Sequence, residues 1–165
     1  MALAPGVVAG AMPWWLTGWR GADWWPPARV FGGVLVLAGA LVLVQAFVRF
    51  VVEGLGTPAP VAPTEHLVIG GLYRHVRNPM YLAVVATTLG QALIFGRPVL
   101  VGYSAVVAAA MWAFATWYEE PALTGQFGAE YTTYKNAVPR WWPRLRPWTP
   151  DQATSSSANR TDPVA

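Results

Sequence analysis

The sequence contains no cysteine, which excludes disulfide bonds, thiolate metal sites and a cysteine nucleophile. Its two histidines, His66 and His75, stand in no HxxxH or HExxH pattern, so we expect no metal. The net charge of +3 includes no basic run of the kind that binds nucleic acid, and no phosphate loop is present. Charge itself is scarce, because 12% of the 165 residues are charged and 55% are hydrophobic. Soluble domains carry about 25% charged residues, so this composition does not favour a water-soluble protein.

Long uncharged runs account for the hydrophobic excess. They cover Ala2 to Trp19, Val30 to Val48, Asn78 to Gly96 and Pro98 to Tyr118. A helix that crosses a membrane needs about 20 such residues. We therefore predict an all-α membrane protein with one domain over 1–150 and about four transmembrane helices, at about 2–19, 28–52, 79–96 and 98–118. The first span is interrupted by Pro5 and Pro13, and it lacks the basic n-region of a secretory signal peptide.

The basic residues are distributed unevenly between the predicted connections. Eight of the eleven lie between the second and third spans or after the fourth, and Arg20, Arg29 and Arg97 lie in the other two connections. The positive-inside rule then predicts that the second connection and both termini are cytoplasmic. We expect a multi-pass protein of a prokaryotic plasma membrane, in contact with membrane lipids. Ten tryptophans, mostly near predicted span ends and in the tail, are typical of interface anchors.

The third and fourth spans are predicted to form an antiparallel helical hairpin. Asn78 is a candidate N-cap, Pro79 suits the first helical position, and the sequence 96–98 (Gly-Arg-Pro) favours a tight reversal. The hairpin would return Glu119 to the membrane face at which Arg77 lies.

After Pro121 the pattern changes to apolar residues at helical spacing. These are Leu123, Phe127, Tyr131 and Tyr134. We predict a C-terminal interfacial helix over about 121–136, followed by a proline-rich tail that lies on the membrane. Residues 151–165 are small and polar, and we expect them to be disordered.

Two charged segments stand out against this apolar background. The stretch "GLYRHVRNPMYL" (71–82) crowds two arginines, a histidine and two tyrosines against the third span, and Glu119-Glu120 follows the fourth. One interpretation is purely structural, in which Arg77 anchors a helix end and the glutamates stop a helix at the water surface. The alternative is a binding site for a cationic or zwitterionic small molecule, built from both signs of charge.

These segments carry a resemblance to a known family. "GLYRHVRNPMYL" follows the pattern G-x-Y-R-x-x-R-[HN]-P-x-Y, and "EEPALTGQFGAEYTTYKNAVPRWWPR" follows E-E-x-x-L-x-x-x-F-G-x-E-Y-x-x-Y-x-x-x-V-P. Over about Gly54 to Arg144 the sequence resembles the isoprenylcysteine carboxyl methyltransferase family. More broadly, it is similar to small integral-membrane methyltransferases that include phospholipid N-methyltransferases. Asn78 stands where the eukaryotic enzymes usually have histidine.

The resemblance implies a pocket for S-adenosylmethionine at the cytosolic face, capped by the C-terminal helix and tail. The cofactor-binding residues that it implies are Tyr73, Arg77, Asn78, Pro79, Tyr81, Glu119, Glu120, Tyr131 and Tyr134. Arg77 is also the candidate catalytic residue, because a guanidinium can orient a polar or anionic acceptor group.

The resulting hypothesis is in-line methyl transfer to a lipophilic, membrane-embedded small molecule or lipid. Such a displacement needs alignment and a dry site more than an acid–base pair. Two alternatives stay open on the residues alone: a membrane-bound nicotinamide-dependent reductase, and a non-catalytic membrane scaffold or transporter.

Overall fold

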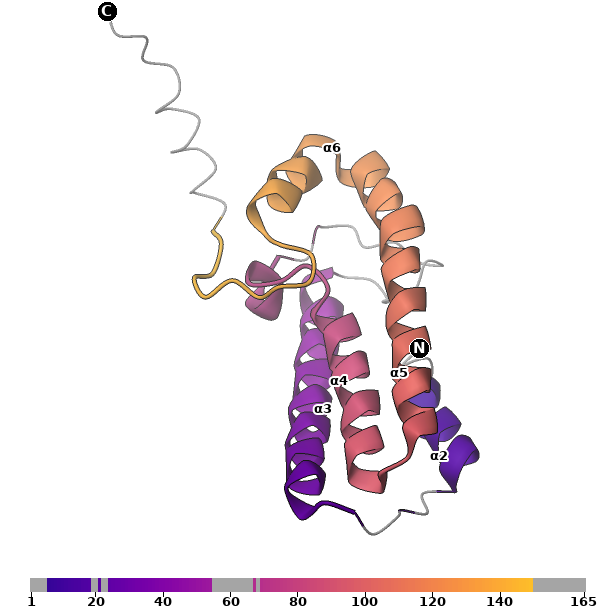
Figure 1. The fold of residues 1–165 in the computed structure, drawn as a ribbon. Helices are drawn as coiled ribbons and strands as arrows, with labels where there is room; N and C mark the ends of the chain where they lie inside the picture. The colour runs from indigo at the N-terminus through magenta and orange to yellow at the C-terminus, as the bar shows by residue number, and fades with distance from the viewer. Residues whose placement is uncertain (1–5, 19–20, 22–23, 55–66, 68, 150–165) are drawn as a thin grey trace, which may run out of the picture.

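The computed structural model describes residues 6–18, 21, 24–54, 67 and 69–149, without the side chains of 49–54. The regular elements within these ranges are all helical, which confirms the predicted all-α class for this part of the chain (Figure 1). They are the π-helix η1 (Val7–Ala11), α2 (Met12–Thr17), α3 (Pro26–Gly54), the 3₁₀-helix η2 (Gly71–Arg74), α4 (Pro79–Phe95), α5 (Pro98–Phe114), the π-helix η3 (Ala115–Glu119) and α6 (Glu120–Ala137). The predicted disordered tail, 151–165, lies outside the described residues.

Two of the described helical stretches are long and apolar enough, by length and composition, to cross a membrane: Pro26–Val48 and Pro98–Ala137. Pro79–Phe95 is a shorter apolar helix of 17 residues. Val7–Thr17 is shorter still, and at 1.5 Å per residue its length is about 16 Å, against a hydrocarbon core of about 30 Å. The expectation of four spans is therefore met in part, and the described part of the first span is too short to cross alone.

A stripe of large apolar residues is exposed along α3. Its members are each at least half exposed: Val30, Val34, Leu37, Leu41, Val44 and Val48. Soluble monomers rarely expose contiguous apolar patches of this extent. The stripe is typical of a surface that faces lipid.

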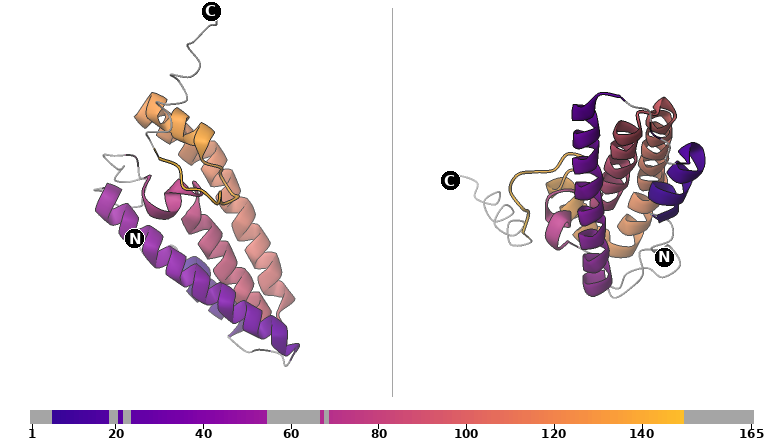
Figure 2. Two further views of the ribbon diagram at one scale, coloured as in Figure 1. Left: turned by 90° about the vertical axis from the view of Figure 1, so that its left-hand side faces the viewer. Right: turned by 90° about the horizontal axis from the view of Figure 1, so that it is seen from below.

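The opposite face of α3 carries small residues every seven positions, at Gly32, Gly39 and Ala46, and packs against α4 (Figure 2). A Cβ added to Gly32 would lie 2.6 Å from the carbonyl oxygen of Gly90, and one added to Gly90 would lie 2.7 Å from that of Gly32. A Cβ on Gly39 would lie 2.8 Å from the carbonyl oxygen of Ala83. The two backbones approach so closely that only glycine fits, which is how membrane helices commonly pack.

We call this close contact of α3 and α4, along Gly32, Gly39 and Ala46, the seam. At its far end, Ala46 packs with Tyr73 and Met80. The same contact that holds α3 and α4 together thus also seats the segment that precedes α4. The helix α3 therefore contacts both α4 and the segment "GLYRHVRNPMYL".

The predicted hairpin between α4 and α5 is present. Gly96 ends α4 with φ +62°, a conformation that glycine adopts without strain, and Pro98 lies in the first turn of α5. Trp24 covers this turn, and its Nε1 donates a hydrogen bond to the carbonyl of Leu93 at 2.8 Å. The helix α4 lies between α3 and α5, and the N-terminal helix lies beside α4 and α5 (Figure 2).

The prediction that the fourth span ends before a separate helix at 121–136 is wrong in one respect. The helix continues from Pro98 through Pro121 and changes direction at Gly128, where φ is +54° and ψ is −119° (Figure 1). Proline inside a helix removes a hydrogen bond and its ring clashes with the preceding turn. Here the π-helical turn of η3 (Ala115–Glu119) lies just before Pro121, and its wider spiral accommodates the proline without a break.

Substitution at Gly32 tests the close approach of α3 and α4. We expect Gly32→Ala to lower the thermal unfolding midpoint in detergent by several degrees, because overpacking costs about 1–3 kcal/mol. Gly33→Ala is the matched control, since a Cβ there meets nothing within 4 Å. The control should be neutral or stabilising, because alanine is the better helix former by about 1 kcal/mol. Equal midpoints for the two variants would contradict the claim that α3 and α4 leave no room for a side chain at Gly32.

Candidate active site

The segment before α4 is hydrogen-bonded to the proline-rich tail along its backbone. The amide of Arg77 donates to Pro139 O at 3.0 Å, that of Arg144 to His75 O at 2.9 Å, and that of Trp148 to Arg74 O at 3.0 Å. The side chain of Arg74 adds a bond from Nε to Trp148 O at 2.7 Å. Figure 1 shows the tail passing beside η2 and the start of α4. Two segments more than sixty residues apart therefore form one unit.

An apolar cluster closes this unit from the side of α6. It consists of Tyr131, Tyr134, Val138 and Trp148, all buried. The hydroxyl of Tyr134 donates to the carbonyl of Tyr73 at 2.7 Å. Trp148 is 6% exposed, so the expectation that the tail tryptophans lie on the membrane is wrong for this residue. Its ring is used instead to pack the tail against Tyr134.

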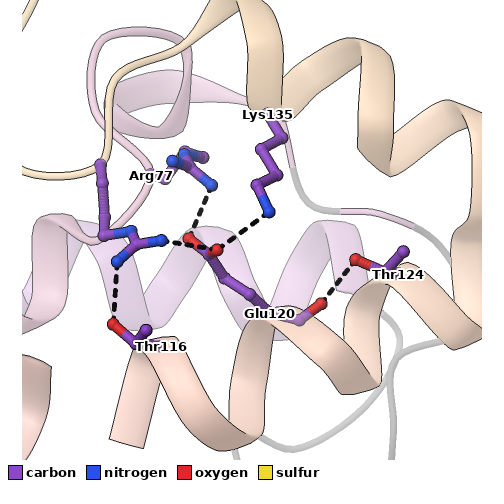
Figure 3. Close-up of polar contacts among 6 residues, drawn as sticks. Arg77, Thr116, Glu120, Thr124 and Lys135 are labelled. Carbon is purple, nitrogen blue, oxygen red and sulfur yellow. Dashed lines mark hydrogen bonds and ion pairs between the residues drawn. The ribbon is translucent and has the colours of Figure 1, made fainter. Parts of the chain in front are cut away.

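The buried carboxylate of Glu120 lies at the centre of an ion cluster (Figure 3). Its Oε1 is 2.8 Å from Arg77 Nη1, and its Oε2 is 2.7 Å from Arg140 Nη2 and 3.2 Å from Lys135 Nζ. The Glu120 side chain is only 8% exposed. Arg140 also donates to the hydroxyl of Thr116 at 2.8 Å. One carboxylate thus joins the start of α4, the helix α6 and the tail.

The surroundings of Glu120 favour its ionised form. Burial alone would raise the pKa of this carboxyl, but Arg77, with Lys135 and Arg140, holds the pKa below its ordinary value. Glu120 lies beyond the uncharged run that ends at Tyr118, at the polar end of the helices. A carboxylate with three cationic partners has little capacity left for a ligand.

The adjacent Glu119 is in a different environment. Its Oε2 accepts a hydrogen bond from the hydroxyl of Tyr81 at 2.7 Å, a neutral partner. Burial raises the pKa of Glu119, the Tyr81 hydrogen bond opposes the rise, and the charge of Glu120 adds to it. Of the two glutamates, Glu119 is therefore the one that can receive a cationic or hydroxyl-bearing ligand.

Two buried nitrogen atoms near this pair have no hydrogen-bond partner among the described residues: Arg77 Nε and Trp141 Nε1. The ring of Trp141 lies 6.5 Å from that of Tyr81, centre to centre. Asn78 occupies the N-cap position of α4, as expected, but its side chain makes no capping hydrogen bond. Pro79 lies in the first turn, as expected.

Most of the site residues expected from the sequence meet at this end of the helices. Arg77 pairs with Glu120, Tyr81 with Glu119, and Tyr134 with Tyr73, and Tyr131 interacts with Arg77. Residues that sequence reasoning did not assign are Thr116, Lys135, Arg140 and Trp141. The signal for Arg140 and Trp141 was their position directly after the Val-Pro pair of the second motif. No periodicity could have shown that a non-helical tail returns to Glu120.

The fold and the site define an apolar helical protein with one polar, charge-paired site at the end of its helices. The phospholipid methyltransferase family model matches residues 27–130, which is more than half of the chain. The chain therefore belongs to the phospholipid methyltransferase family, to which the isoprenylcysteine carboxyl methyltransferases are related. The match includes Arg77, Tyr81, Glu119 and Glu120 and ends before Tyr131. No curated protein matches the chain significantly.

Removing the charge of Glu120 should destabilise the fold. Glu120→Gln leaves Arg77 and Arg140 without a buried anion, and breaking such a pair costs about 3 kcal/mol. Glu119→Gln should have a much smaller effect, because the amide oxygen can still accept from Tyr81. Thermal unfolding of both variants in the same detergent measures the difference. A Glu120→Gln midpoint equal to that of wild type would show that the cluster of Figure 3 does not stabilise the protein.

The raised pKa of Glu119 predicts a pH effect of definite sign. Above the ordinary pKa of 4.5 the unfolded chain loses this proton while the folded protein retains it, so stability falls as the pH rises through that interval. Wild type should therefore lose stability relative to Glu119→Gln as the pH is raised from about 4.5. The difference in unfolding midpoint, measured at half-unit pH steps, checks this. A wild type that gains stability relative to the variant would refute it.

Proposed function

We propose that this protein transfers a methyl group from S-adenosylmethionine to a lipophilic acceptor held in the membrane. The observation that carries the proposal is the pairing of Arg77 with Glu120 and of Tyr81 with Glu119. These pairs join the two sequence motifs at one end of apolar helices, in a chain of the phospholipid methyltransferase family.

The chemistry of the site fits this cofactor. S-adenosylmethionine has an ammonium group, a carboxylate and two ribose hydroxyls, and when bound it would supply a methyl group activated on a sulfonium. Glu119 can accept hydrogen bonds from an ammonium or from hydroxyls. The buried Nε of Arg77 has no acceptor within the described part of the chain, which suits an oxygen atom of a ligand.

The residues of the chain then act by positioning and by excluding water. Methyl transfer needs no covalent enzyme intermediate, and its barrier is lowered by alignment in a dry site. Arg77 is held through Nη1 by Glu120, so its guanidinium has a defined orientation. We propose that it orients a polar or anionic group, and that the tail from Pro139 to Trp148 shields the site from water. Tyr73, Asn78, Pro79, Tyr131 and Tyr134 support this arrangement as packing and backbone elements.

We further propose that the site faces the cytoplasm of a prokaryotic cell. Arg74, Arg77, Lys135, Arg140 and Arg144 lie at the same end as the site, whereas Arg29 and Arg97 lie near the other end. The positive-inside rule favours a cytoplasmic position for the more basic end. A cofactor would then enter from the cytosol, and a lipophilic acceptor would enter from the bilayer along the exposed apolar helices.

Binding of S-adenosylhomocysteine tests the proposal. We expect the detergent-purified wild type to bind it, measured by calorimetric titration, and to transfer a labelled methyl group from S-adenosylmethionine to extracted membrane lipids. Glu119→Gln should bind about tenfold more weakly, since a charge-assisted hydrogen bond contributes about 1.5–3 kcal/mol. Glu130→Gln, an exposed position in α6, is the matched control and should bind like wild type.

Absence of binding by the folded wild type would overturn the proposed function. Unchanged binding by Glu119→Gln would leave the enzyme class standing and reject the role of this carboxylate.

A further inference from the structure

Two buried hydrogen-bond donors at the site have no partner among the described residues, and they come from two different segments. Arg77 Nε belongs to the segment before α4, and its side chain is 10% exposed. Trp141 Nε1 belongs to the tail, and Trp141 is not among the cofactor-binding residues that the family resemblance implies. A buried donor without an acceptor loses its hydration and gains no hydrogen bond in return, so each of these atoms has reason to meet a ligand oxygen.

The segments that carry the two donors are in contact. The backbone amide of Arg77 is bonded to Pro139 O, and Trp141 follows two residues later. The Trp141 ring packs at 6.5 Å from Tyr81, whose hydroxyl binds Glu119. Glu119 in turn precedes Glu120, the partner of Arg77. Arg77 and Trp141 therefore belong to two segments that meet beside the Tyr81–Glu119 pair, whose carboxylate can face an ammonium.

We propose that Arg77 Nε and Trp141 Nε1 together bind a ligand carboxylate, so that Trp141 is a ligand-binding residue of this protein. This inference rests on the proposed function, which it makes specific to one chemical group. A guanidinium and an indole N–H are donors only, and neither can serve a cation or another donor. In Arg77, Nη1 is bonded to Glu120, and Nε is a buried donor with no partner among the described residues. A second donor from Trp141 then completes a two-point contact with the two oxygens of a carboxylate.

The carboxylate can come from the amino-acid end of the cofactor or from an anionic lipophilic acceptor. The cofactor source is favoured by Glu119, because an α-amino acid presents an ammonium beside its carboxylate. The experiment separates the two sources with two pairs of probes. S-adenosylhomocysteine carries the amino acid, and 5′-methylthioadenosine lacks it. Palmitate carries a carboxylate on an alkyl chain, and hexadecanol lacks it.

Trp141→Phe removes the N–H and keeps a ring against Tyr81. We expect it to weaken S-adenosylhomocysteine binding about tenfold relative to wild type and to leave 5′-methylthioadenosine binding unchanged. Trp142→Phe is the matched control, because Trp142 is its sequence neighbour and is 83% exposed. The ratio of the two dissociation constants is measured in one preparation, so a fraction of inactive protein cancels. Arg77→Lys, which keeps a cation for Glu120 and loses Nε, should change the ratio in the same direction.

Each outcome decides the proposal. If Trp141→Phe weakens binding of S-adenosylhomocysteine alone, the result supports the proposed site, with the cofactor as the source of the carboxylate. If S-adenosylhomocysteine binding is unchanged and palmitate binding is weakened relative to hexadecanol binding, the result supports the site, with the acceptor as the source of the carboxylate. Equal weakening of both nucleosides would overturn it, because Trp141 would then shape the pocket without recognising a carboxylate. No change for any probe would also overturn it. In either of these last two cases, the proposed function would still stand if the wild-type protein binds S-adenosylhomocysteine.

Discussion

The site depends on one buried carboxylate, that of Glu120. It is held by Arg77 from the start of α4, by Lys135 from α6 and by Arg140 from the tail. Burial removes water from the carboxylate, and three cations compensate by stabilising its ionised form. The pKa of Glu120 is lowered as a result. Because its partners come from three different segments, the ion cluster fixes the tail over the motif before α4. The backbone bonds of Arg77, Arg144 and Trp148 then extend that contact along the tail.

The position of this carboxylate is set by packing in the apolar part of the molecule. Glycines on α3 and α4 allow the two backbones to touch, and the same seam ends at Ala46 against Tyr73 and Met80. On the other side of the site, the π-helical turn before Pro121 keeps the long helix continuous. Successive residues on a helix point about 100° apart. Neighbouring glutamates consequently enter different surroundings, with Glu120 paired to cations and Glu119 bonded to the Tyr81 hydroxyl.

Much of the fold could be predicted from local pattern. The uncharged runs gave the helices α3, α4 and α5 to within a few residues, and Gly96 with Pro98 gave the reversal between α4 and α5. The continuity of the helix through Pro121 could not be predicted, because proline is normally a helix breaker and nothing local shows that a wider turn precedes it. The burial of Trp148 was also missed, because an indole suits a membrane interface and a packed tail equally well.

The sequence by itself determined the apolar helical class, the hairpin and the membership of the phospholipid methyltransferase family, whose model matches residues 27–130. These properties follow from composition and short-range spacing, which can be seen in each segment without its tertiary contacts. Only the tertiary structure decided which glutamate is neutralised by cations, that Arg140 of the tail pairs with Glu120, and that Trp141 lies beside Tyr81. Such roles depend on distances between segments far apart in the chain, and ionisation and hydrogen bonding respond to those distances rather than to sequence separation.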